Sequence, residues 1–211
     1  DGSLFYLVLP EHIYNPYGSS SFSFKIWTGL NGWTSRGTFS IPFPSINVTI
    51  PNRISIAKAT NNIRLLAIGG DGSSPYSPCP NALFRSTNGG TSWALVTNVP
   101  VAMRSVAFGN GVFLGAGTNG AIYRASSTSG TNWTKVNTNT VSYENLLFAG
   151  NLFFSPRGVS KDGAVWVPFA AGSYWWGYDG AAYGGNSKLL LLGSTQASTN
   201  PVPSAFVPPN P

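Results

Sequence analysis

Short apolar stretches alternate with polar turns along the whole chain, and one such pattern recurs four times. Each copy is an apolar stretch, a turn that carries an asparagine, and a second apolar stretch. The turn asparagines are Asn62, Asn110, Asn151 and Asn186, spaced 48, 41 and 35 residues apart. An Asn turn between two apolar stretches is a strong signal for a β-hairpin. The pattern therefore predicts a β unit that is used several times.

A second repeated pattern follows the hairpins. The segments Asn81–Trp93 and Gly120–Trp133 align along their length, and their tryptophans are 40 residues apart. Each segment consists of an apolar stretch, a turn rich in Gly, Ser and Asn, and a stretch that begins with Trp. A unit of this size cannot bury its apolar face alone, so the sequence predicts a repeat protein whose units pack on one another.

Together the two patterns predict four antiparallel strands per unit, which is the blade of a β-propeller. In the third unit, Val165-Trp166 aligns with Leu83-Phe84 and Ile122-Tyr123. The predicted strands are Arg53–Lys58, Ile63–Ile68, Ala82–Ser86 and Trp93–Thr97; Arg104–Phe108, Val112–Ala116, Ala121–Ala125 and Trp133–Val136; and Asn145–Ala149, Leu152–Ser155, Ala164–Pro168 and Ser173–Gly177.

The two ends of the chain match this unit in part. The beginning supplies strands two to four and the end supplies strands one to three, at Phe5–Leu9, Phe24–Thr28, Trp33–Gly37, Ala181–Tyr183, Lys188–Leu192 and Ala205–Val207. We therefore expect an all-β fold, a β-propeller of four-stranded antiparallel blades, with five blades favoured. A four-bladed ring whose ends share a blade ranks second, and a β-sandwich third because sandwiches do not repeat.

The polar turn before Trp93 resembles the Asp-box of the sialidase-like repeat families, Ser-x-Asp-x-Gly-x-Thr-Trp. It runs from Ser86 to Trp93, with Asn88 at the Asp position. The segment 126–133 keeps only the Gly and Trp anchors, since Thr128 replaces the Asp. This resemblance implies a propeller in which the motif is a structural turn and its Trp packs between sheets. It does not imply sialidase activity.

Composition narrows the class of protein. Only 9% of the 211 residues are charged, and Gly and Pro contribute 25 and 16 residues, so Ser, Thr and Asn make the surface polar. Such a surface is typical of extracellular or virion proteins. This bias and the Phe-Gly-Asn-Gly hairpin turn also resemble phage tail-fibre and spike receptor-binding domains, and an adhesin has the same character. One domain covering 1–211 is expected.

Charge and cysteine content exclude several kinds of partner. The net charge is +6, but the 12 basic residues lie singly, which argues against nucleic acid. The longest strongly apolar run, Leu189 to Leu192, is too short to insert into a membrane. Cys79 is the one cysteine, so neither an internal disulfide nor a Cys/His metal cluster is expected, and no cofactor is predicted.

The chain begins Asp1-Gly-Ser and lacks an initiator methionine. We therefore expect a domain excised from a longer protein. The sequence leaves open whether that longer protein forms a homo-oligomer through its flanking regions.

Loop lengths predict where a ligand binds. In an antiparallel blade, the loops that join strands one to two and three to four lie on one face, and the two-to-three loops lie on the other. The first set is short and repeated, whereas four of the five loops in the second set are long and unlike one another. The second set is Pro10–Ser23, Gly69–Asn81, Gly117–Gly120, Pro156–Gly163 and Gly193–Ser204. Binding concentrates in such dissimilar loops.

The predicted ligand-binding residues lie in these loops and in the neighbouring connections between blades. Aromatic rings beside polar side chains suit sugars. The set is His12, Tyr14, Tyr17, Asp71, Tyr76, Arg157, Lys161, Asp162, Trp175, Trp176 and Tyr178. For His12 a local hydrogen bond, for Lys161-Asp162 a solvated turn, and for Trp175-Trp176 one ring in the core are the structural alternatives.

Catalysis has less support in the sequence. A glycosidase needs two carboxylates about 5 Å or about 6.5–9.5 Å apart, and Glu11 and Glu144 are the only acidic pair not explained as turn or terminal residues. Arg53, Arg104 and Tyr143 occupy matching blade positions and would be needed for a sialidase-like mechanism. We predict a non-catalytic module that recognises a cell-surface glycan or other host receptor. A structural virion or assembly domain and a sialidase-like glycoside hydrolase are the alternatives.

Overall fold

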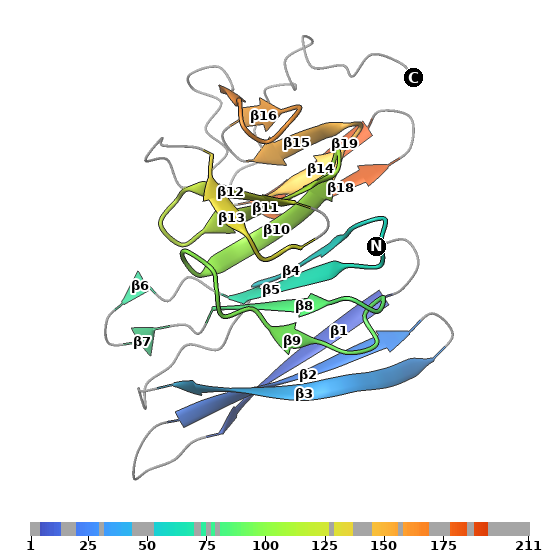
Figure 1. Ribbon diagram of the computed structural model, residues 1–211, viewed down its shortest axis with the longest axis vertical. Helices are drawn as coiled ribbons and strands as arrows, with labels where there is room; N and C mark the ends of the chain where they lie inside the picture. Colours follow the sequence, from blue (N-terminus) through green and yellow to red (C-terminus); the bar gives the residue numbers. More distant parts are fainter. Residues whose placement is uncertain are drawn as a thin grey trace.

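The computed structural model describes a chain built from β-strands and turns (Figure 1). No helix occurs in the residues it describes, and so none there could span a membrane. The described residues are 5–13, 20–29, 32–43, 53–69, 73–74, 77–78, 81–126, 129–136, 145–155, 158–168, 178–184 and 188–193.

Three four-stranded antiparallel sheets follow one another along the chain, each with its strands in sequence order. This is the blade organisation of a β-propeller, and it confirms the predicted fold class. The first of these sheets contains β4 (Arg53–Lys58), β5 (Arg64–Gly69), β8 (Ala82–Ser86) and β9 (Ala94–Leu95). The second contains β10 (Met103–Gly109), β11 (Val112–Gly117), β12 (Ile122–Ser126) and β13 (Trp133–Lys135). The third contains β14 (Leu147–Ala149), β15 (Leu152–Ser155), β16 (Gly158–Ser160) and β17 (Val167–Pro168).

Smaller sheets come before and after these three. The described strands of the N-terminal sheet are β1 (Phe5–Ile13), β2 (Ser20–Gly29) and β3 (Trp33–Phe43). The last described pair is β18 (Tyr178–Gly184) and β19 (Lys188–Gly193). A two-stranded ribbon of β6 (Ser73–Ser74) and β7 (Ser77–Pro78) interrupts the connection from β5 to β8.

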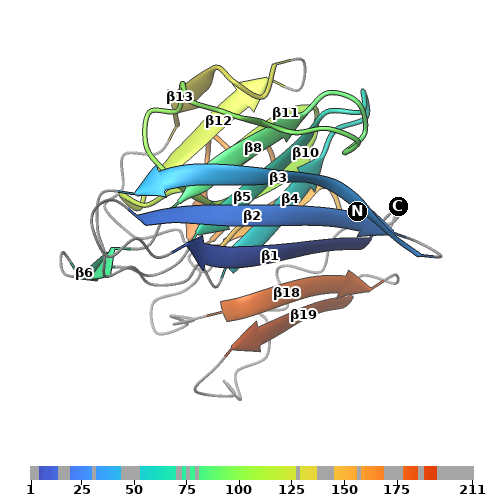
Figure 2. The same cartoon turned by 90° about the horizontal axis from the view of Figure 1, so that it is seen from below.

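The sheets stack face to face in chain order (Figure 1). Seen from below, the β1–β2–β3 sheet lies across the sheet that contains β4, β5 and β8 (Figure 2). All six residues of β5 and all six of β11 are buried. Strands that are buried on both faces need an apolar layer on each side. One core cluster therefore packs Leu65 against Phe113, and the next joins Leu114 to Phe153.

The tryptophan that follows each three-to-four turn packs toward the preceding sheet. Trp93 belongs to the cluster that joins its sheet to the N-terminal sheet. Trp133 and Trp166 pack in the same way one and two sheets later. Trp33 begins the last strand of the N-terminal sheet, which no described sheet precedes, and it is 54% exposed. The exposure of this ring thus follows from its place in the stack.

The predicted asparagine hairpins are confirmed where they are described. Asn62, Asn110 and Asn151 have φ angles of 65°, 45° and 62°. This left-handed region is open to Asn more readily than to most other non-glycine residues. The fourth turn asparagine, Asn186, lies outside the described residues.

Serine hydroxyls join the first strands of neighbouring sheets. The Ser55 Oγ donates to the Val106 carbonyl oxygen at 2.9 Å and accepts from the Val106 amide at 3.0 Å. One sheet later, the Leu146 amide donates to the Ser105 Oγ at 3.0 Å, and the two serine oxygens lie 3.2 Å apart. A first strand has an edge that its own second strand cannot pair. The serine hydroxyls form hydrogen bonds with some of the backbone amide and carbonyl groups along that edge.

In the third sheet, the third and fourth strands are formed by other segments than predicted. Its third strand is β16 and its fourth is β17, so the predicted strand Ala164–Pro168 was placed one strand too early and Ser173–Gly177 lies outside the described residues. The connection Pro156–Gly163, predicted as a long two-to-three loop, spans only residues 156–157 between β15 and β16. The apolar pair Val165-Trp166 caused the error because it resembles the third strands of the other sheets.

The strands at both ends of the chain are longer than predicted. β1 continues to Ile13 and β2 begins at Ser20, so the expected loop Pro10–Ser23 reduces to residues 14–19. β3 continues to Phe43 instead of ending at Gly37, and β18 begins at Tyr178 instead of Ala181. Phe39, Ile41 and Phe43 recur at every second position, which is the period of a strand, so the continuation of β3 could have been predicted from the sequence. The number of blades stays a prediction.

We expect Ser55→Ala to lower the free energy of unfolding by about 1–3 kcal/mol, because Val106 loses the partner of its buried amide and carbonyl groups. Urea unfolding followed by tryptophan fluorescence measures the change. Ser35→Ala is the matched control, since Ser35 is exposed on β3 and its loss should cost less than about 0.5 kcal/mol. Equal losses in the two variants would contradict the inter-sheet role of Ser55.

Candidate functional site

The connections between strands emerge at two opposite ends of the sheets. The β6–β7 ribbon, which belongs to a two-to-three connection, lies at the left in Figure 1. The β4–β5 and β8–β9 turns lie at the right. Antiparallel order imposes this separation, as the sequence predicted. The three-to-four turns therefore share an end with the asparagine hairpins.

The turn from Ser86 to Trp93 is held by its own side chains. The Asn88 Oδ1 accepts from the Ser86 hydroxyl at 3.0 Å and from the Ser92 amide at 2.9 Å. The Gly90 amide donates to the Ser86 Oγ at 2.8 Å, and the Trp93 indole donates to the Gly90 carbonyl at 3.1 Å. These bonds fix the turn and anchor its Trp.

The turn from Ser160 to Trp166 has the same bonding with an aspartate. The Asp162 Oδ1 accepts from the Ser160 hydroxyl at 3.2 Å and from the amides of Ala164 and Val165 at 2.9 and 3.0 Å. The Trp166 indole donates to the Gly163 carbonyl at 3.0 Å. Hydrogen bonds from Val165, then from Ala164, hold the pKa of Asp162 below its ordinary value of 3.8. Trp166 is thus the counterpart of Trp93, not of Phe84.

In the β12–β13 turn, the tryptophan lacks the indole hydrogen bond that Trp93 and Trp166 make. The Trp133 indole nitrogen is buried and has no hydrogen-bond partner among the described residues. Gly130 has a φ of 58°, and a Cβ there would lie 3.3 Å from Leu65 Cδ2. A glycine at this position therefore lets the turn close on the neighbouring sheet.

Two of the predicted ligand-binding residues lie in a different connection from the one that the sequence predicted. Lys161 and Asp162 lie in the β16–β17 turn, not in a two-to-three loop. Asp162 is occupied by its own turn. Lys161 is exposed, and its carbonyl oxygen accepts a hydrogen bond from the Asn110 Nδ2 at 2.7 Å. Their predicted place on the long-loop face is therefore wrong.

His12 and Tyr178 lie in strands rather than in connections. His12 pairs with Phe22 in the β1–β2 ladder, and Tyr178 pairs with Gly193 in the β18–β19 ladder. Neither side chain is among those described. The other predicted residues lie outside the described part of the chain, and their grouping stays a prediction: Tyr14, Tyr17, Asp71, Tyr76, Arg157, Trp175 and Trp176.

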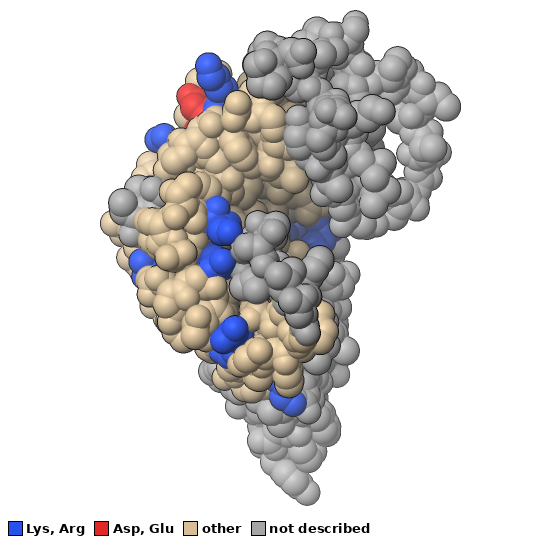
Figure 3. Space-filling view, turned by 90° about the vertical axis from the view of Figure 1, so that its right-hand side faces the viewer, with Lys and Arg blue, Asp and Glu red and all other residues tan. Residues whose placement is uncertain are grey.

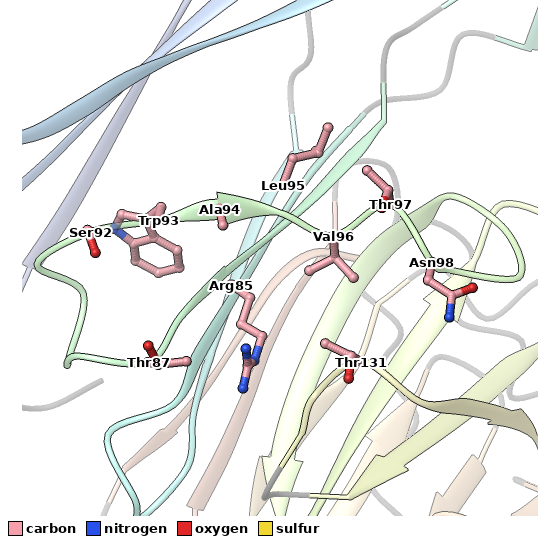
Figure 4. Close-up of a pocket in the computed structure, with 10 residues that line it drawn as sticks. All are labelled: Arg85, Thr87, Ser92, Trp93, Ala94, Leu95, Val96, Thr97, Asn98 and Thr131. Atoms are coloured by element: carbon pink, nitrogen blue, oxygen red, sulfur yellow. The ribbon is translucent and has the colours of Figure 1, made fainter.

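A pocket of about 320 Å³ opens between the outer strands of the first two four-stranded sheets (Figure 4). Most of its polar groups are hydroxyls, and the others include one side-chain amide and one guanidinium. Trp93 and Val96 supply apolar surface. Its lining is Arg85, Thr87, Ser92, Trp93, Ala94, Leu95, Val96, Thr97, Asn98 and Thr131. Thr131 comes from the β12–β13 turn, so two sheets build the wall.

Arg85 is the charged residue of this pocket. It stands on β8 between Leu65 of β5 and Ala94 of β9. Figure 4 shows its guanidinium pointing into the space between Thr87 and Thr131. Its Nε is buried and has no hydrogen-bond partner among the described residues. A buried donor without a partner costs free energy, and such a group is a candidate for contact with a ligand, an ion or water.

The next sheet repeats this arrangement around Arg124. Arg124 pairs with Leu114 and Thr134, as Arg85 pairs with Leu65 and Ala94. A cavity of about 410 Å³ adjoins Arg124 and is lined by Gly111, Val112, Arg124, Ala125, Asn132, Thr134 and Val136. Arg124 is exposed, whereas Arg85 is partly buried. The repeat thus places two arginines at equivalent positions in different surroundings.

Positive charge dominates the described surface (Figure 3). Among the side chains that the structure describes, ten are basic and one, Asp162, is acidic. The basic set is Lys25, Arg36, Arg53, Lys58, Arg64, Arg85, Arg104, Arg124, Lys135 and Lys161.

Sequence reasoning missed the pocket although it aligned the two arginines. Arg85 and Arg124 fall at the same position in the segments Asn81–Trp93 and Gly120–Trp133. An arginine at the same position of two otherwise apolar strands was the signal that could have indicated the pocket. We assigned that end of the sheets to scaffold because its loops are short, but the pocket lies between sheets and needs no long loop.

The described residues contain no group of three or more His, Cys, Asp or Glu side chains that could hold a metal ion. Glu11 lies on β1, where its side chain is not among those described, and Glu144 lies outside the described residues. The distance between these two predicted carboxylates therefore lies outside what the structure describes. Arg53 and Arg104 belong to the first strands β4 and β10, as predicted.

No protein-family model matches the chain, and the comparison with curated protein sequences finds no match. Solved structures with a similar course of the chain include YCF48 bound to D1 peptide, with 17% identity, a TM-score of 0.45, and coverage of 78% of this chain and 56% of that one. The WD40 β-propeller domain of Doa1 has 10% identity and a TM-score of 0.46 over 83% and 58%. An α-L-arabinofuranosidase from Fusarium graminearum has 15% identity and a TM-score of 0.37 over 70% and 52%. This chain thus spans a little over half the length of each.

Asp162→Asn should lower the free energy of unfolding near neutral pH and should remove part of its pH dependence. Folding lowers the Asp162 pKa from its ordinary value of 3.8, so its contribution to stability is present above that value and is lost as the pH falls through the lower folded value. Urea unfolding at pH 7, 5 and 3 measures the difference, which should shrink at pH 3. Asn88→Asp, the reciprocal change, should gain the same dependence, and a difference that stays constant from pH 7 to 3 would contradict the assignment.

Proposed function

We propose that this chain is a recognition module that binds a glycan on a cell surface. Its most plausible setting is the host-recognition tip of a phage tail fibre or spike, on the virion surface or outside the cell. The scarcity of charged residues and the Ser, Thr and Asn bias support this setting. A propeller suits the role because its rigid sheets position surface groups.

The pocket beside Arg85 carries the proposal. Sugars present hydroxyl groups and apolar ring faces, and a site for them needs polar groups that converge on an apolar floor. Thr87, Thr97, Asn98 and Thr131 supply the polar groups, and Val96 supplies apolar surface. The volume of about 320 Å³ lies at the small end of ligand pockets and suits a terminal sugar ring rather than a long chain.

Binding without catalysis is favoured by the distribution of carboxylates. Glycoside hydrolysis by the common mechanism needs a pair of them beside the scissile bond. The described residues that line the pocket include neither Asp nor Glu. We therefore assign recognition, not hydrolysis, to this pocket.

The hydrogen-bonded turns support a second part of the proposal. We assign the Ser86–Trp93 and Ser160–Trp166 turns to the Asp-box type, since both use an Oδ1 to accept backbone amides and both anchor a Trp. In this role the turns are structural. The Ser86–Trp93 turn holds Ser92 and Trp93 where they line the pocket.

A glycan array with the wild-type chain and two tryptophan variants tests the proposal. Thr131→Trp places a large ring at the pocket wall and should abolish most of the array signal. Thr134→Trp is the matched control, since Thr134 lies on the same sheet and is exposed but does not line this pocket. Circular dichroism and thermal unfolding confirm that both variants fold.

Reproducible binding that Thr131→Trp removes and Thr134→Trp keeps would support the assignment. Binding that survives Thr131→Trp but is lost on Tyr14→Ala, Tyr76→Ala or Trp176→Ala would move the site to the long loops. Silence of the wild-type chain across the array would contradict the proposed function and favour a structural virion or assembly domain.

A further inference from the structure

We propose that the Arg85 pocket selects an acidic sugar, one that carries a carboxylate or a sulfate group. The inference rests on the proposed glycan-binding function and names the ligand class of the same pocket. In this assignment the guanidinium of Arg85 pairs with the anionic group, and the hydroxyl and amide groups around it contact the sugar ring.

The buried Nε of Arg85 is the first argument. Arg85 has a fixed charge, because guanidinium does not lose its proton in proteins. Its Nε is shielded from solvent without a hydrogen-bond partner among the described residues. The end of the guanidinium, which points into the pocket (Figure 4), is the part of Arg85 that a ligand would contact. An anionic acceptor would suit it best, since hydrogen bonds that involve a charged group are roughly twice as strong as neutral ones.

The absence of a competing carboxylate in the pocket is the second argument. No residue in the described lining of the pocket is acidic, and the one acidic side chain described, Asp162, is occupied by the amides of its own turn. Among the described side chains, ten are basic. Within this part of the chain, the charge of Arg85 thus has no acidic partner.

The surroundings of the guanidinium favour an anionic sugar over a bare anion. A carboxylate or sulfate matches the planar fork of the guanidinium, but it fills only part of a volume of about 320 Å³. The remaining wall offers Thr87, Thr97, Asn98 and Thr131, and Val96 lies on its apolar side. Hydroxyl groups beside an apolar ring face complement that wall.

Arg124 is the internal control that the repeat provides. It occupies the same position in the next sheet and carries the same charge. Its side chain is exposed, and its nitrogens are not among the buried atoms without a partner. Removing Arg124 therefore changes the net charge as removing Arg85 does, without changing the proposed pocket.

The experiment uses three methyl glycosides that differ at C6 of galactose: the neutral sugar, the galacturonate and the 6-sulfate. Binding is followed by NMR, and the readout is the Arg85 Nε–H resonance of the wild-type chain, assigned through its Cδ protons. We expect an acidic glycoside to shift this resonance and to bind about 10-fold more tightly than the neutral one, which corresponds to about 1.4 kcal/mol. The galacturonate and sulfate arms distinguish the two acidic classes.

Arg85→Gln should remove the preference for the acidic glycoside, whereas Arg124→Gln should keep it. Arg85→Lys, which keeps the charge but loses the planar fork of the guanidinium, should keep only part of the preference. The wild-type resonance keeps the test valid if Arg85→Gln does not fold. Equal losses from Arg85→Gln and Arg124→Gln would overturn the inference by showing diffuse charge attraction.

The remaining outcomes separate this inference from the proposed function. If the array shows glycan binding, but the acidic glycosides bind no more tightly than the neutral one and leave the Arg85 resonance unmoved, acidic selection is wrong and recognition stands. If the array is silent and no glycoside moves any resonance, both fail.

Discussion

The burial of both faces of the first two four-stranded sheets is the constraint on which the rest of the structure depends. β5 and β11 are buried along their whole lengths, so either sheet alone would leave two apolar faces in water. Neighbouring sheets cover each other through Leu65 and Phe113, and through Leu114 and Phe153. Stacking is therefore a condition of folding and not a later assembly of finished units.

The same constraint produces the turns and the pocket. A turn must close on the neighbouring sheet without a gap, and Gly130 and Gly163 do so against Leu65 and Leu114. The side-chain bonds within the Ser86–Trp93 and Ser160–Trp166 turns hold the tryptophans that fill the space between sheets. Toward the outer strands the sheets no longer fill that space, and a pocket remains beside Arg85. Ligand recognition there would use a product of sheet packing rather than of a long loop.

The sequence predicted what depends on local periodicity. The Asn hairpins and the four-strand order are local patterns, and both are confirmed. The third sheet misled us because Val165-Trp166 resembles an apolar strand, while the actual third strand, Gly158–Ser160, is too short to show a period. The pocket escaped prediction for a different reason. Arg85 and Thr131 are 46 residues apart and meet only when two sheets pack, and no pattern within one strand encodes that contact.

The central claim is that the sheets pack in chain order with their first strands side by side. Oxidation of a chain that carries Ser55→Cys and Ser105→Cys, with Cys79→Ser to remove the native thiol, tests it most directly, because the two serine oxygens lie 3.2 Å apart. The account predicts an intramolecular disulfide that forms in high yield under mild oxidation and is seen by mass spectrometry as the loss of two hydrogens. The Ser55→Cys, Lys161→Cys pair in the same background serves as the control that stays reduced. A 55–105 pair that remains reduced, or that cross-links only between molecules, would contradict the account.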